Sequence, residues 1–178
     1  MSFSNFCQII SSTALKAVAV HWNEARAERR MPSWGDIRPS RISAHLPIVW
    51  AFKYDSQTRE FTGRLAGQQI EHILSICIRG LPLSDVFSDN AFPWAQKLFS
   101  RVVLEPAMCR SSGHVFQQYN RLGIGERIIL PLSADGTICD GILGASQYVY
   151  TTAASECAAQ SEDWFFLSPI DPEARNSN

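Results

Sequence analysis

The sequence has almost no net charge and no long apolar segment. Its 16 Lys and Arg residues against 17 Asp and Glu residues leave a formal charge of −1, so nothing predicts electrostatic binding to nucleic acid or to an anionic membrane. No apolar run reaches the roughly 20 residues of a transmembrane helix. The first residues also lack the basic region and apolar stretch of a secretion signal. We therefore expect a cytoplasmic protein with neither a nucleic-acid nor a membrane partner.

Signatures of metal binding and catalysis are also missing. The five cysteines are odd in number and widely spaced, with no CxxC pair and no Cys–His arrangement at metal-ligand spacing. We expect reduced thiols and no metal site. The sequence contains no GxSxG or HExxH motif and no glycine-rich phosphate-binding pattern. We predict no catalytic residue, and hence that the protein is not an enzyme; the sequence indicates no particular cofactor.

What is present is the composition of a globular domain. Of the 178 residues, 46% are hydrophobic and 19% are charged, which is typical of a chain that buries a real core. Composition and breaker residues suggest three parts. These are an N-terminal helix and extension at 1–32, one domain at 33–150, and a partly disordered C-terminal extension at 151–178.

The first predicted element is a helix over residues 13–30. Leu15, Val18 and Trp22 recur at helical spacing and form an apolar stripe, and Met31-Pro32 ends the helix. The stripe either packs back on the chain's own sheet or meets a second copy. We expect a homodimer, formed through this helix, through the outer face of the sheet, or through both.

Strands are predicted from alternation and from turn residues. Trp50, Phe52 and Tyr54 share one face of the first strand, and Asp135-Gly136 between two apolar runs is a strong hairpin signal. After the first helix, the predicted elements are a short helix at about 39–47, strands at 47–54 and 60–67, a helix at 68–78, a short turn or one-turn helix at 81–87, a helix at about 90–105, and strands at 107–120, 126–132 and 137–149.

The order of these elements, a hairpin, then helices, then a three-strand meander, resembles the PAS fold, and several short motifs resemble one bacterial PAS-like group. The similarity covers about residues 18–148, whereas Trp164–Leu167 has no equivalent in that pattern. The motifs are Met31-Pro32-Ser33, Asp36-Ile37-Arg38-Pro39, Leu46-Pro47, Arg64-Leu65-Ala66-Gly67, Gly80-Leu81-Pro82-Leu83-Ser84-Asp85-Val86 and Leu130-Pro131-Leu132-Ser133-Ala134-Asp135-Gly136.

This resemblance implies a stand-alone sensory or regulatory domain. PAS-like domains bind small molecules or cofactors, dimerise, and pass a signal to an output. This domain would bind a small molecule or a protein partner, and would act alone or through a separate signalling partner protein. We expect an α+β fold with a five-stranded antiparallel sheet, helices on one face of it, and an extra N-terminal helix packed outside the core.

We expect a ligand pocket between sheet and helices, with Arg64 or Tyr119 supplying a polar contact; a plain packed core is the alternative for the same apolar side chains. The pocket candidates are Trp50, Phe52, Phe61, Arg64, Leu65, Ile73, Phe87, Phe99, Phe116, Tyr119, Ile128, Leu130 and Leu143.

Two other functions fit the same class of fold. A small cavity enzyme similar to ketosteroid isomerases would use a buried acid and a tyrosine, for which Asp140 and Tyr119 are the candidates. A haem-binding sensor would use a pocket-facing histidine, for which His72 is the candidate. A carboxylate deep in the cavity with a raised pKa would support the enzyme.

Overall fold

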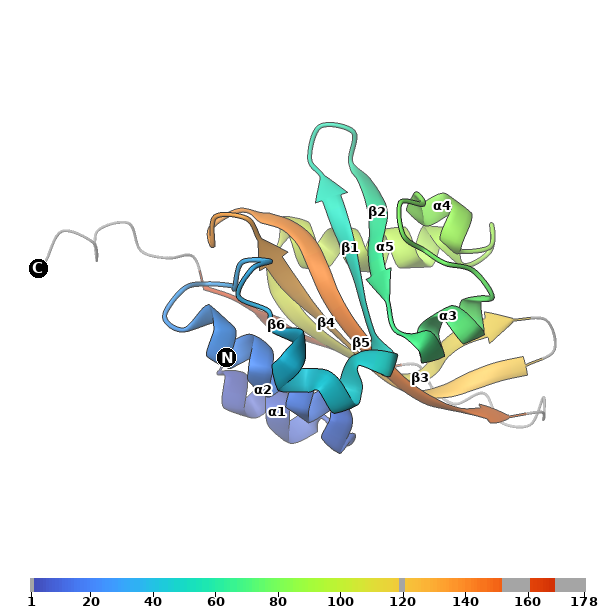
Figure 1. The fold of residues 1–178 in the computed structure, drawn as a ribbon, viewed down its shortest axis with the longest axis horizontal. Helices are drawn as coiled ribbons and strands as arrows, with labels where there is room; N and C mark the ends of the chain where they lie inside the picture. The colour runs from blue at the N-terminus through green and yellow to red at the C-terminus, as the bar shows by residue number, and fades with distance from the viewer. Residues whose placement is uncertain (1, 119–120, 152–160, 169–178) are drawn as a thin grey trace, which may run out of the picture.

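The computed structural model describes residues 2–118, 121–151 and 161–168 (Figure 1). The N-terminal part holds helices α1 and α2 and the 3₁₀ segment η1, and the rest alternates between strands and three further helices. The elements are α1 (Phe3–Ile9), α2 (Thr13–Arg26), η1 (Pro39–Ile48), β1 (Val49–Asp55), β2 (Glu60–Ala66), α3 (Gln68–Leu74), α4 (Leu83–Val86), α5 (Phe92–Leu104), β3 (Ala107–Gln118), β4 (Arg121–Ser133), β5 (Cys139–Thr151) and β6 (Ser161–Phe166).

The strands form one antiparallel sheet in the order β2-β1-β5-β4-β3-β6. The α+β class, the first hairpin and the meander are confirmed, but the sheet has six strands and not the five expected. The additional strand, β6, contains most of the Trp164–Leu167 run and pairs with β3, Met108 lying opposite Phe165. Its partner lies some fifty residues earlier in the chain, and the sequence alone does not show which strand has a free edge.

Helices cover both faces of the sheet, not one (Figure 1). Strand β4 shows why, because successive side chains of a strand point to opposite faces. Ile128, Ile129 and Leu130 are all fully buried, so both faces of β4 are covered by protein. Helices α1 and α2 lie on one face, and α3, α4 and α5 lie on the other.

Helix α2 belongs to the core of this chain. Leu15, Val18 and Trp22 are fully buried, and Trp22 Nε1 donates a 2.9 Å hydrogen bond to the carbonyl oxygen of Pro131 in β4. The stripe therefore packs within the monomer, and the helix does not lie outside the core. Homodimerisation itself stays a prediction.

Two helices end earlier than their periodicity suggests. Helix α2 stops at Arg26 because Ala27 adopts a φ of 50°, and α3 stops at Leu74 because Ser75 is in the left-handed region.

Helix α1, which was not predicted from the sequence, is capped by Ser2. Its Phe6 ring lies 5.3 Å from Phe165 of β6, so α1 covers the end of the sheet that β6 extends.

The division into residues 1–32, 33–150 and 151–178 stays a prediction, although β6 joins part of the last segment to the sheet. Residues 152–160 and 169–178, where disorder was expected, lie outside the described residues. In the described part of the chain, no helix combines the length and apolar character needed to cross a membrane.

Candidate functional site

A cavity lies between the sheet and the helices α3 and α5. Its volume is about 50 Å³, far below the roughly 300–1,000 Å³ of pockets that hold drug-sized ligands. Most of the wall is apolar, and four of the described lining residues, Trp50, Arg127, Ser146 and Tyr148, carry polar side-chain atoms. The lining residues are Trp50, Phe52, Ile70, Ile73, Leu74, Ile78, Phe87, Phe99, Arg127, Ser146 and Tyr148.

Aromatic rings form the wall between β1 and α5. The Trp50 and Phe99 rings stack with centroids 5.2 Å apart, and the Phe52 and Phe87 rings lie 5.5 and 6.2 Å from Phe99. Alternation along β1 directs Trp50 and Phe52 to the same side of the sheet, where α5 presents Phe99. This wall is therefore held by several rigid contacts around one ring.

Trp50 lies flat against the neighbouring strand because that strand has a glycine opposite it. Gly144 of β5 is the register partner of Trp50, and a Cβ atom at Gly144 would meet the indole ring at 2.1 Å. The indole Nε1 then donates a 3.0 Å hydrogen bond to Ser146 Oγ, two residues further along β5. The glycine thus sets both the position of the ring and the direction of its N–H group.

Arg127 is the charged residue among the described lining residues. It is 6% exposed, and its Nε donates a 3.2 Å hydrogen bond to Ser146 Oγ, its register partner across β4 and β5. Its guanidinium carbon lies 5.2 Å from the centroid of Trp94 and 5.9 Å from that of Trp50, within cation–π range.

Burial lowers the pKa of the Arg127 guanidinium to about 10, so the side chain still carries its positive charge at neutral pH. Arg127 was not among the pocket residues predicted from the sequence. The sequence feature that could have indicated it is an arginine directly before the apolar run Ile128–Leu132. The face of the sheet to which this arginine points, however, depends on the strand register.

The structure brings some of the predicted pocket residues together. Trp50, Phe52, Ile73, Phe87 and Phe99 line the cavity. Their role in binding a ligand stays a prediction, but their location is the one that strand alternation and helix periodicity indicated.

The hairpin residues among the candidates lie elsewhere. Phe61 is buried with its ring 5.8 Å from Phe99 but does not line the cavity, and Leu65 is largely exposed. The Arg64 guanidinium stacks 4.4 Å above the Trp34 ring, which packs at Gly141. Arg64 therefore does not supply the polar contact expected of it, because Trp34 holds it away from the cavity.

Ile128, Leu130 and Leu143 are buried on the opposite face of the sheet, beneath α2, and not in the cavity. The reason is again alternation, since their strand neighbours Arg127 and Ile142 face the other way. Their apolar character predicted burial but not the face. The backbone of Phe116 belongs to β3 and its side chain lies outside the described set, as does all of Tyr119.

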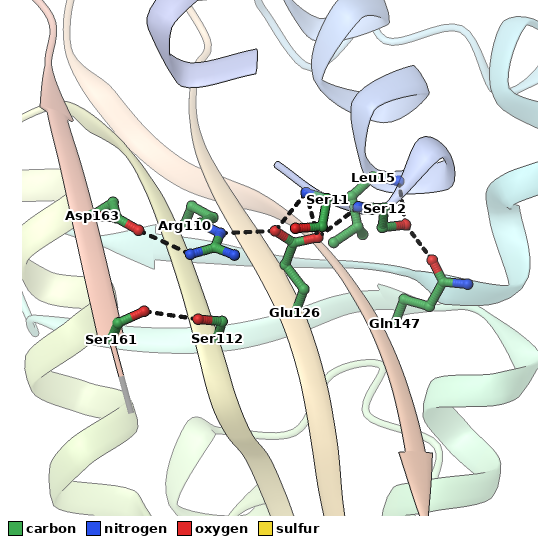
Figure 2. A network of polar contacts seen from close by, with 9 residues as sticks. All are labelled: Ser11, Ser12, Leu15, Arg110, Ser112, Glu126, Gln147, Ser161 and Asp163. Atoms are coloured by element: carbon green, nitrogen blue, oxygen red, sulfur yellow. Dashed lines mark hydrogen bonds and ion pairs between the residues drawn. The ribbon is translucent and has the colours of Figure 1, made fainter. Parts of the chain in front are cut away.

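The opposite face of the same strands carries a different polar cluster, in which Glu126 binds the start of α2 (Figure 2). The Glu126 carboxylate accepts hydrogen bonds from the backbone N–H groups of Ser11, at 2.9 and 3.1 Å, and Ser12, at 2.8 Å. It also accepts one from Arg110 Nε at 2.7 Å. Arg110 in turn contacts Asp163 of β6 at 3.1 Å. The cluster therefore ties α2 and β6 to the sheet.

Of the residues proposed for the two alternative functions, the described ones, His72 and Asp140, do not line the cavity. His72 is exposed on α3. Asp140 lies at the β4–β5 hairpin, where it accepts hydrogen bonds from Trp34 Nε1 at 2.8 Å and Ala134 N at 3.0 Å. Among the described residues, no group of three His, Cys, Asp or Glu side chains is placed to hold a metal ion.

The fold and the site define an α+β domain with a largely apolar cavity between its sheet and the helices α3 and α5, lined on the sheet side by the buried cation Arg127. A family model described as a PAS domain matches residues 10–147, and the chain belongs to the PAS domain family. A search of the curated proteins found no match, and neither did a search of the solved structures. The family predicted from the sequence is thus confirmed.

Proposed function

We propose that this domain senses a small molecule, which it binds in the cavity between the sheet and helices α3 and α5. The observation that carries the proposal is the convergence of Arg127, Ser146 and the Trp50 indole N–H on the wall of an otherwise apolar cavity. A concave apolar site with a few convergent polar groups is the usual form of a small-molecule site. Membership of the PAS domain family fits such a sensory or regulatory role.

The effect of ligand binding would be transmitted from the cavity to the outer surface through the strands β4 and β5. Arg127 and Ser146 at the cavity are register partners, and the adjacent pair, Glu126 and Gln147, faces α2. Gln147 accepts a hydrogen bond from the Ser12 hydroxyl, which also caps α2. A shift of these strands would therefore move the start of α2, and a separate partner protein would read that change.

The experiment combines a search for a ligand with a variant that fills the cavity. Native mass spectrometry of the purified full chain looks for a retained small molecule, and a thermal-shift screen of fragments looks for new ones. Ile73→Phe adds a ring at the cavity wall and should abolish binding of any hit. Ile138→Phe is the matched control, because Ile138 is 70% exposed at the β4–β5 hairpin and should leave binding unchanged.

The cavity proposal fails if a bound molecule tolerates Ile73→Phe as well as it tolerates Ile138→Phe. It also fails if neither native mass spectrometry nor the fragment screen finds a ligand for the folded full chain. The thermal unfolding transition of each variant shows that the fold is retained.

A further inference from the structure

We infer that the cavity takes a small monocarboxylate with a short apolar tail, whose carboxylate is bound by Arg127 and Ser146. The inference rests on the proposed function and names its ligand class. The cavity wall carries an arginine, Arg127, beside a hydroxyl, Ser146. Arginine presents N–H donors in a planar fork that matches a carboxylate, and it keeps its charge when buried.

The surroundings of Arg127 hold its fork in a fixed plane. Nε is directed to Ser146 Oγ at 3.2 Å, and the guanidinium lies against the Trp94 and Trp50 rings. An arginine restrained by a hydrogen bond and two aromatic faces loses little freedom when a ligand binds. The site is in this respect preorganised for an anion.

Ser146 extends the anion site by one donor. Its Oγ accepts from both Trp50 Nε1 and Arg127 Nε, so its own hydroxyl proton is directed to a third group. A hydroxyl has one proton to donate and two lone pairs to accept with. A carboxylate oxygen at the cavity wall would accept that proton while its partner oxygen accepts from the guanidinium.

The remaining walls limit the rest of the ligand. Ile70, Ile73, Leu74 and Ile78 line the helix side of the cavity and suit a hydrocarbon tail. The volume of about 50 Å³ is a third of the roughly 150 Å³ cavity that holds benzene in another protein. The tail is therefore one or two carbons long, as in acetate or propionate.

The same walls argue against ligands with two charges. A second carboxylate, or the second charge of a phosphate, would lie among apolar side chains, where burying an unpaired charge is very unfavourable. Succinate and inorganic phosphate should therefore bind at least about tenfold more weakly than propionate. The neutral isostere propionamide should also bind at least about tenfold more weakly, because it lacks the charge that strengthens a hydrogen bond to arginine.

The test titrates the dialysed full chain with sodium propionate, propionamide, succinate and phosphate at constant ionic strength, using the Trp indole N–H signals in NMR. Five-atom ligands bind weakly, and we expect a dissociation constant of about 0.1–1 mM for propionate. Arg127→Gln should raise it at least about tenfold. Arg64→Gln is the matched control, since Arg64 also stacks on a tryptophan but away from the cavity, and it should leave the constant unchanged.

Several results would overturn the inference. Propionamide binding as tightly as propionate, or unchanged propionate binding in Arg127→Gln, would remove the carboxylate as the recognised group while leaving a cavity ligand in place. Propionate binding that survives Ile73→Phe would put the anion outside the cavity. Absence of saturable propionate binding would also reject this ligand class, and the fragment screen would then decide separately whether the cavity binds anything.

Arg127→Gln can also fail to fold, because Arg127 is buried. The comparison of propionate with propionamide on the unmodified chain does not depend on that variant. Ser146→Ala provides a second, smaller change at the same site. It should weaken propionate binding about threefold to tenfold while leaving propionamide less affected, through the loss of one hydrogen bond to a charged ligand.

Discussion

The two faces of the sheet are built from the same strands but differ in the contacts of their buried charged residues and in how tightly they are packed. Under α2, the carboxylate of Glu126 is held by the backbone N–H groups just before α2 and by Arg110 (Figure 2). Ile128 and Leu130 of the same strand are fully buried. Under α3 and α5, the buried charge among the described residues is a cation, Arg127, which lines the cavity. One face therefore satisfies its buried charge within the chain, whereas the other leaves a cavity, which we propose a ligand fills.

The strongest test of the face under α2 removes the charge at its centre. Glu126→Gln keeps the shape of the side chain but removes the negative charge closest to Arg110, so we expect a loss of about 2–4 kcal/mol in the free energy of unfolding. Urea unfolding followed by tryptophan fluorescence measures it. Asp163 still contacts Arg110, which keeps the loss below that of a completely isolated buried charge.

Glu24→Gln is the control for that substitution. Glu24 and Arg41 form an ion pair at 3.8 Å between largely exposed side chains, and such pairs contribute about 0–1 kcal/mol. If both variants lost the same free energy, the Glu126 cluster would be no more important than a surface ion pair. The contrast between the two faces would then lose its energetic basis.

The second test adds the same volume to each face. Ile128→Phe overfills a site with no exposed area and should cost about 1–3 kcal/mol of unfolding free energy. Ile73→Phe adds its extra carbons beside the cavity, so the free energy of unfolding should change by no more than about 1 kcal/mol in either direction. Parallel urea titrations give both values, and an Ile73→Phe cost equal to that of Ile128→Phe would mean that the cavity does not accommodate the ring.

The elements of the fold could be predicted from the sequence because each depends on local pattern. The stripe of Leu15, Val18 and Trp22 marked a helix, and Asp135-Gly136 marked the hairpin between β4 and β5. What the pattern could not supply was the partner of each element. The helix stripe is equally consistent with a second copy and with the chain's own sheet. Its full burial within the single chain and the hydrogen bond from Trp22 to Pro131 show that it packs on the sheet.

The candidate site was predicted only in part for a related reason. Trp50 and Phe52 were identified because their strand alternates and their size suggests burial. In β4, by contrast, apolar side chains occupy both faces, so Ile128 and Leu130 could not be distinguished from residues that face the cavity. Arg127 was missed because a charged residue in a strand predicts exposure, and its burial depends on the tertiary contacts with Trp94 and Ser146.

The smallest expected effect concerns a connector of the face under α2, the segment between α2 and η1. Asp36 Oδ2 accepts hydrogen bonds from Ser33 N at 2.8 Å, Ser33 Oγ at 2.6 Å and an Arg29 guanidinium nitrogen at 2.6 Å. The two hydrogen bonds from Ser33 and the nearby Arg29 lower the pKa of the Asp36 carboxyl to about 2. Since its side chain is 33% exposed, solvent screening reduces the resulting stabilisation, and we expect Asp36→Asn to cost about 0.5–1 kcal/mol at pH 6.

The sign of the pH dependence follows from the direction of that shift. A carboxyl whose pKa is lower in the folded than in the unfolded chain stabilises the fold at every pH above its unfolded value, near 3.8. The stabilisation is lost as the pH falls from about 4 through about 2, where the folded carboxyl takes up its proton. The gap in urea midpoint between the unmodified chain and Asp36→Asn should therefore be constant from pH 7 to pH 5, narrow below about pH 4 and largely close at about pH 1.5, with exposed Asp89→Asn as the surface control. A gap that does not narrow between pH 4 and about pH 1.5 would mean that the charge of Asp36 does not stabilise this connector, and its hydrogen bonds alone would then account for the cost of the substitution.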